Sequence, residues 1–132
     1  MSSDRGKRLQ HAFAEFLTRW WVNAESQPNG RAGVDILGTP GVAFECKTAR
    51  EFRPLEWARQ ARKNAGTYKH GFADLPVVVW FPDGTGKQMT DAAMMLMPVE
   101  VGMILLENSG YAPRPSTAPR PLELADVDTE AG

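Results

Sequence analysis

Three charged side chains lie in segments that are otherwise apolar. Asp35 stands within Val-Asp-Ile-Leu, and Glu45 and Lys47 follow ten and twelve positions later within Val-Ala-Phe-Glu-Cys-Lys. Charged groups rarely enter such surroundings unless they are paired or bind a metal ion. Two carboxylates about 4 Å apart would repel by about 4 kcal/mol at an effective dielectric constant near 20. A shared proton, a salt bridge to Lys47 or a divalent cation would therefore have to compensate.

Each form of compensation implies a different role for the three residues. A site that offers only oxygen ligands favours Mg²⁺ or Mn²⁺, since one or two carboxylates commonly hold Mg²⁺ together with water and substrate phosphate. A lysine beside such an ion can orient the attacking water and counter the charge of a transition state. On spacing alone, a structural ion pair in which Lys47 neutralises Glu45 is an equal alternative.

Two strands would have to position these side chains. Residues 34–37 and 42–47 flank Gly-Thr-Pro-Gly, a turn signal that predicts a β-hairpin. Residues two apart on a strand share a face, so Glu45 and Lys47 should lie on one face, and the alternating phenylalanine and cysteine should point into apolar packing. The matching hairpin register places Asp35 across from Glu45, whereas a shift by one residue would separate them.

The other elements follow from apolar periodicity and turn residues. In chain order we expect a helix at 4–22, a loop at 23–32, the two strands, a helix at 54–66, strands at 76–81 and 92–97, and a helix at 98–108. This order predicts an α/β (α+β) fold with a small mixed sheet of about four strands flanked by helices. We expect one domain, residues 1–109, and a Pro-rich, acidic, disordered tail, residues 110–132.

The overall net charge of −1 hides an uneven distribution. Residues 1–70 carry twelve Lys and Arg against seven Asp and Glu, a balance of +5, and residues 71–132 carry three against nine, a balance of −6. The basic half indicates either a face for a polyanion or a solvated surface of mixed charge. Without a signal-type N-terminus or an apolar run of about 20 residues, the sequence predicts a cytoplasmic protein with no membrane contact.

The charged motif in this order of elements resembles the PD-(D/E)XK nuclease superfamily. Gly-Val-Asp-Ile-Leu-Gly, a short turn and Phe-Glu-Cys-Lys, between an N-terminal helix and a helix bearing Trp and Gln, are most similar to small Holliday-junction resolvases of phages and their bacterial hosts. The resemblance covers roughly residues 5–106 in element order, but only the charged motif is specific. Val34 stands where many members have proline. The resemblance implies a restriction-endonuclease-like core and hydrolysis of DNA with Mg²⁺ or Mn²⁺ in a prokaryotic or phage-infected cell. The likeness to resolvases implies that this DNA is branched.

Particular residues take on roles through this resemblance. Asp35 and Glu45 would ligate the metal ion, and Lys47 would be the catalytic lysine. Glu15 matches a further acidic ligand from the first helix, and Gln60 matches a catalytic glutamine, although each suits an ordinary surface position equally well. The basic residues implied to contact DNA phosphates are Arg31, Arg50, Arg53, Arg59, Arg62 and Lys63.

The resemblance also implies a partner and leaves alternatives open. A junction-resolving enzyme would act as a symmetric homodimer, because it must cut two strands at related positions. Another nuclease of the superfamily, such as a nickase or a restriction-like enzyme, fits the same motif. So do a non-catalytic DNA-binding module with this fold and a small interaction protein whose basic half is only surface.

Overall fold

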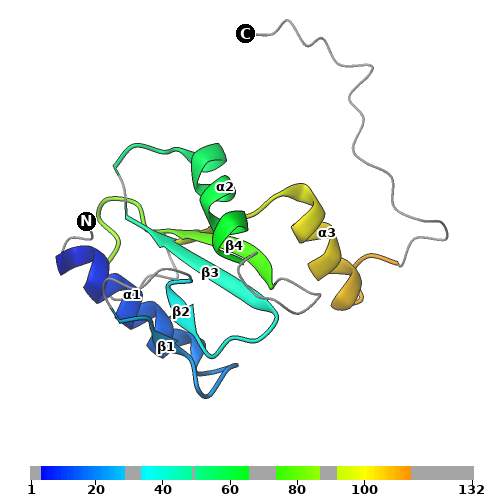
Figure 1. The fold of residues 1–132 in the computed structure, drawn as a ribbon, viewed down its shortest axis with the longest axis horizontal. Helices are drawn as coiled ribbons and strands as arrows, with labels where there is room; N and C mark the ends of the chain where they lie inside the picture. The colour runs from blue at the N-terminus through cyan, green and yellow to red at the C-terminus, as the bar shows by residue number, and fades with distance from the viewer. Residues whose placement is uncertain (1–3, 29–33, 49, 66–73, 87–91, 114–132) are drawn as a thin grey trace, which may run out of the picture.

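The computed structural model describes residues 4–28, 34–48, 50–65, 74–86 and 92–113. Its elements are α1 (Asp4–Leu17), β1 (Glu25–Ser26), β2 (Ile36–Leu37), β3 (Val42–Lys47), α2 (Pro54–Ala65), β4 (Leu75–Trp80), β5 (Met94–Leu96) and α3 (Val99–Asn108), as Figure 1 shows. The predicted mixture of helices and strands is confirmed. Within the described ranges, no helix has the length and apolar character needed to cross a membrane.

The strands form two small sheets where the sequence predicted one sheet of about four strands. β3, β4 and β5 form a three-stranded sheet in that order, in which β3 and β4 are parallel and β4 and β5 are antiparallel. β1 and β2 form a separate antiparallel pair. α2 provides the crossover between β3 and β4, because parallel neighbours cannot be joined by a tight turn.

The predicted hairpin between residues 34–37 and 42–47 is wrong. β2 pairs with β1, which lies in the segment predicted as a loop, and β3 takes β4 as its ladder partner. Gly38 has a φ of +81°, and a Cβ atom there would overlap the backbone carbonyl oxygen of Asn23. This close approach directs the chain toward the segment that leads into β1. One backbone hydrogen bond, from the Asp35 N–H to the Phe44 carbonyl at 3.1 Å, still joins the two predicted strands.

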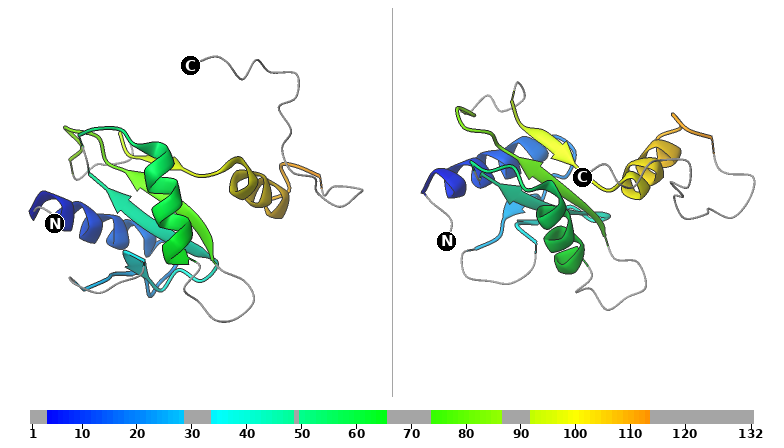
Figure 2. Two further views of the ribbon diagram at one scale, coloured as in Figure 1. Left: turned by 45° about the horizontal axis from the view of Figure 1, so that its top comes forward. Right: turned by 90° about the horizontal axis from the view of Figure 1, so that it is seen from above.

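α1 and α2 cover opposite faces of the three-stranded sheet, as the views in Figures 1 and 2 show. On the α1 face, Leu9, Phe13 and Leu17 pack in one core with Phe44, Cys46, Val77 and Val79. On the α2 face, Trp57 and Ala61 pack against Val78 and Trp80. The prediction that the phenylalanine and cysteine of β3 enter apolar packing is therefore confirmed, and Glu45 and Lys47 face α2.

The helix boundaries are close to those predicted, with one exception. α2 begins at Pro54, where the missing N–H costs no hydrogen bond, and ends one residue before the predicted end. α1 ends at Leu17 rather than near residue 22, because the Thr18 hydroxyl and N–H both bond back to the Glu15 carbonyl and the chain continues as turns. Most of the predicted tail, residues 114–132, lies outside the described residues.

Candidate active site

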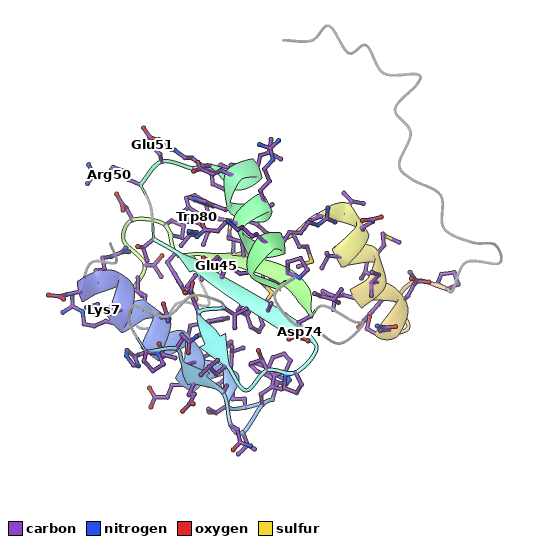
Figure 3. The ribbon with its side chains drawn as sticks, in the orientation of Figure 1. Lys7, Glu45, Arg50, Glu51, Asp74 and Trp80 are labelled. Carbon is purple, nitrogen blue, oxygen red and sulfur yellow. The ribbon has the colours of Figure 1, made fainter. Side chains whose placement is uncertain are left out.

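Glu45 and Lys47 meet beneath α2 on the same face of β3. The Glu45 side chain is only 6% exposed, and its Oε1 lies 3.6 Å from Lys47 Nζ. Its Oε2 accepts a hydrogen bond of 3.0 Å from Asn64 Nδ2 on α2. Figure 3 shows Glu45 on the sheet below this helix, with Trp80 nearby on the same side. Each oxygen of the buried carboxylate therefore has a partner within the protein.

Asp35 joins this group from the edge of β3 that does not face β4. Its Oδ2 accepts a hydrogen bond of 2.7 Å from the Cys46 N–H, while its own N–H donates to the Phe44 carbonyl. The two bonds straddle Glu45, so the predicted closeness of the two carboxylates arises although no hairpin forms. Gln10 of α1 donates to the Asp35 carbonyl oxygen at 2.9 Å and fixes the backbone at this position.

α2 supplies the groups that hold the lysine. Lys47 Nζ donates a hydrogen bond of 2.6 Å to Gln60 Oε1, so the structure brings this predicted residue into the site. Gln60 and Asn64 are four residues apart and lie next to each other along the helix. Because Trp57 and Ala61 anchor the neighbouring stripe of α2 on the sheet, the two amides are directed at the Lys47 and Glu45 side chains.

Burial and mutual repulsion set the electrostatics of the two carboxylates. Burial raises the pKa of Asp35, opposed by the Cys46 N–H and the Lys47 charge. Burial, followed by the charge of Asp35, raises the pKa of Glu45, opposed by Asn64 and Lys47. Burial also raises the pKa of the Cys46 thiol well above its ordinary value. One lysine therefore compensates the two acids incompletely, and a cation would be favoured beside them.

The donor set fits a hard divalent cation held in part by water. Asp35 and Glu45 offer carboxylate oxygens, and two carboxylates are a usual protein contribution to a Mg²⁺ site. In the described part of the chain, no third Asp, Glu, His or Cys completes a metal-binding group with them. Glu15 is exposed on α1 and lines a recess beside Arg19, so the structure does not bring this predicted ligand to the site.

The basic residues predicted to contact DNA divide into paired and unpaired groups. Arg50 pairs with Asp83 at 3.0 Å, Arg53 with Glu51 and Glu56, and Arg62 with Glu100 at 3.6 Å. Among the described residues, no carboxylate forms an ion pair with Arg59 or Lys63. Arg31 lies outside the described residues.

The position of each residue around α2 decides which of the basic side chains lie near the site. Successive helix residues turn by about 100°, so Lys63 is about 60° from Gln60 and Arg59 about 100° from it. Arg62 is about 160° away, on the flank that faces α3 through Glu100. Figure 3 shows Arg50 and Glu51 on the loop that leads from β3 into α2. Lys63 and Arg59, rather than Arg62, therefore border the site.

Two residues of the site were not predicted from the sequence. Asn64 stands four positions after Gln60, so helical spacing from the predicted glutamine is a signal that could have identified it. Gln10 acts through the backbone of Asp35, and no sequence pattern marks such a contact.

No family model, curated protein or solved structure matches the chain. The geometry described above is therefore the basis of the functional proposal.

Proposed function

We propose that the chain is a metal-dependent endonuclease that hydrolyses DNA phosphodiester bonds at the group formed by Asp35, Glu45 and Lys47. The observation that supports this proposal is the buried, mutually repelling carboxylate pair beside a lysine held at 2.6 Å by Gln60. A structural ion pair needs one acid for one base, whereas this group has an acid in excess. The excess negative charge suits a cation and, through it, a phosphate.

The residues would divide the work as follows. Asp35 and Glu45 would hold Mg²⁺ or Mn²⁺, which supplies a Lewis acid and a water of lowered pKa when bound. Lys47 has three N–H donors, and Gln60 takes one of them. A remaining donor can hold the attacking water or a phosphate oxygen, where a fixed positive charge stabilises the transition state. Asn64 keeps the Glu45 carboxylate in place.

The surface around the group suits a long polyanion. Lys63 and Arg59 on α2 border the site, and Arg50 and Arg53 lie on the loop before this helix. Their exposed ion pairs with Asp83, Glu51 and Glu56 are each worth little, so phosphates can replace those partners. We leave Arg62 out of this surface because it lies on the other flank of α2.

Cleavage of synthetic DNA tests the proposal. The substrates are a four-way junction, a flap and a linear duplex, each incubated with Mg²⁺, Mn²⁺ or EDTA. Lys47→Met, Glu45→Gln and Asp35→Asn should each lower the cleavage rate by about a hundredfold or more. Lys7→Met on α1 and Glu107→Gln on α3 are matched controls, since both positions are half-buried and lie on helices that contribute no side chain to the group of Asp35, Glu45 and Lys47.

Each outcome separates one class of function from the others. Metal-dependent cleavage that is lost in the site variants and kept in the controls supports the proposal, and preference for the four-way junction supports the resolvase subtype. DNA binding without cleavage under either metal would replace it with a non-catalytic module. Neither binding nor cleavage on any substrate would rule out both.

The homodimer implied by the resemblance stays a prediction. Light scattering coupled to size-exclusion chromatography measures the mass of the particle in solution against the 14.6 kDa of one chain. A particle of twice that mass, alone or on a four-way junction, is the expected result.

A further inference from the structure

A recess of about 910 Å³ lies along α1, and neither carboxylate of the candidate active site lines it. Its apolar wall is formed by Leu9, Ala12 and Phe16, and its basic residues are Arg5, Arg8 and Arg19. Thr85 and Gly86, which follow β4, line it as well. Arg5 donates to the carbonyl oxygens of Pro82, at 3.0 Å, and Thr85, which ties this segment to α1.

The recess lies along α1, whereas the active site lies beneath α2, on the other face of the sheet. Gln10 turns toward Asp35 and contacts its carbonyl oxygen. Arg8 is about 160° around the helix axis from Gln10, at 100° per residue, and Arg19, two residues past the end of α1, lines the recess with it. A ligand in the recess would therefore not compete with one at the carboxylates.

The charge of the recess favours an anion. Its lining contains three arginines and one acid, Glu15, with His11 as a further polar group. Arg8 is exposed, and among the described residues no carboxylate pairs with it or with Arg19. Arg50, Arg53 and Arg62, in contrast, all have carboxylate partners.

The aromatic side chains favour an anion that carries flat rings. Trp20 is 63% exposed and packs edge-on against Phe16, with 5.2 Å between the ring centroids. Arg19 lies over the Phe16 ring at 5.2 Å. Arginines that track a backbone and aromatic rings on which bases stack are the two components of single-strand binding sites. Arg5 to Phe16 spans about 17 Å along α1, so the groove can follow a stretch of backbone.

We propose that this groove, the recess lined by Arg5, Arg8, Phe16 and Arg19 with the exposed Trp20 ring beside it, binds single-stranded nucleic acid. Duplex fits it less well, because paired bases are stacked inside the helix and cannot reach the exposed Trp20 ring. Binding at the groove does not depend on cleavage at the carboxylates. An experiment can therefore disprove the groove while the nuclease proposal stands, or the reverse.

The binding is measured by the fluorescence anisotropy of a labelled twelve-nucleotide oligothymidylate, in EDTA and at several salt concentrations. An oligouridylate of equal length compares RNA with DNA. The double variant Arg8→Ala/Arg19→Ala should bind at least about tenfold more weakly. The slope of log K against log salt concentration should also be smaller in magnitude by about 1.4, which is about 0.7 for each lost phosphate contact. Trp20→Ala should weaken binding about fivefold or more without changing the slope.

The controls keep the assignment specific to the groove. Lys7→Ala/Arg62→Ala removes the same charge from other surfaces and should bind as the wild type does. Wild-type affinity and slope in the Arg8/Arg19 variant would overturn the proposal, as would an equal loss in the Lys7/Arg62 variant. An acidic peptide of the same charge should bind more weakly than the oligonucleotide. If it binds equally tightly and Trp20→Ala does not weaken its binding, the assignment to nucleic acid is overturned.

Discussion

Glu45→Gln should stabilise the metal-free protein at pH 7, although it removes one partner of an ion pair. The Glu45–Lys47 attraction at 3.6 Å is about 4.6 kcal/mol at an effective dielectric constant of 20. Repulsion from Asp35 opposes it. The remaining term is the cost of burying a charge, and the raised pKa of Glu45 shows that this cost prevails. Glutamine keeps an oxygen for Asn64 and bears no charge.

The expected gain is on the order of 1 kcal/mol, which corresponds to about 4 °C in Tm for a domain of about 110 residues. A site with two carboxylates should bind Mg²⁺ with a dissociation constant on the order of 1 mM. A cation concentration of about 10 mM then stabilises the wild type by about 1.4 kcal/mol, or about 6 °C. The order of the two melting temperatures should therefore reverse: the variant melts higher in EDTA, and the wild type melts higher in Mg²⁺.

The pH dependence has a definite sign. Folding raises the pKa of Glu45 above its ordinary value of 4.5, so the native state holds this proton more tightly than the unfolded state. The resulting stability is fully present below about pH 4 and is lost as the pH rises through the folded pKa. In urea unfolding without metal, the difference between variant and wild type should vanish near pH 3.5 and reach its full size at pH 7.

Two results would refute this reasoning. A loss of more than about 1 kcal/mol in Glu45→Gln at pH 7 would make Glu45 a structural partner of Lys47, since breaking a well-made buried pair is costly. Equal stabilisation of variant and wild type by Mg²⁺ would place the cation elsewhere. Glu107→Gln, on α3, shows how much the loss of any half-buried carboxylate contributes.

Three further predictions concern the surroundings of the site. Gln60→Ala should slow metal-dependent cleavage about tenfold while urea unfolding changes by less than about 0.5 kcal/mol, because the residue is exposed and its main contact is with Lys47. Gly38→Ala should cost about 2 kcal/mol more than Gly41→Ala in the same unfolding assay: both glycines have positive φ, but only at position 38 would the Cβ meet backbone. The Cys46 thiol should react with a disulfide reagent at least about tenfold more slowly in the native state than in urea, because burial raises its pKa, and an equal rate would contradict its placement in the core.

Alternation along one strand was enough to predict the orientation of the charged motif. Glu45 and Lys47 were expected on one face, and they meet there beneath α2. Gln60, which was expected only through the family resemblance, lies beside the apolar stripe of its helix and contacts Lys47. These inferences hold because the periods of strands and helices are local properties of the chain.

The pairing of the strands was not predictable in the same way. Gly-Thr-Pro-Gly is a turn signal, but the direction of the chain after Asp35 depends on the packing of Gly38 against Asn23, which lies fifteen residues earlier. β3 finds its partner, β4, only after the α2 crossover. Pairing across such distances depends on how the whole core closes and leaves little trace in local sequence.

The hydrogen bond from the Cys46 N–H to Asp35 has a consequence for self-association. β3 is the edge strand of its sheet, and a free N–H on an edge strand can recruit a strand from another chain. The Asp35 carboxylate occupies this donor, so the side chain proposed for chemistry also protects the edge against aggregation. Alanine at this position would remove both roles together, whereas asparagine retains an acceptor for the N–H. Asp35→Asn is therefore the variant that separates loss of chemistry from loss of solubility.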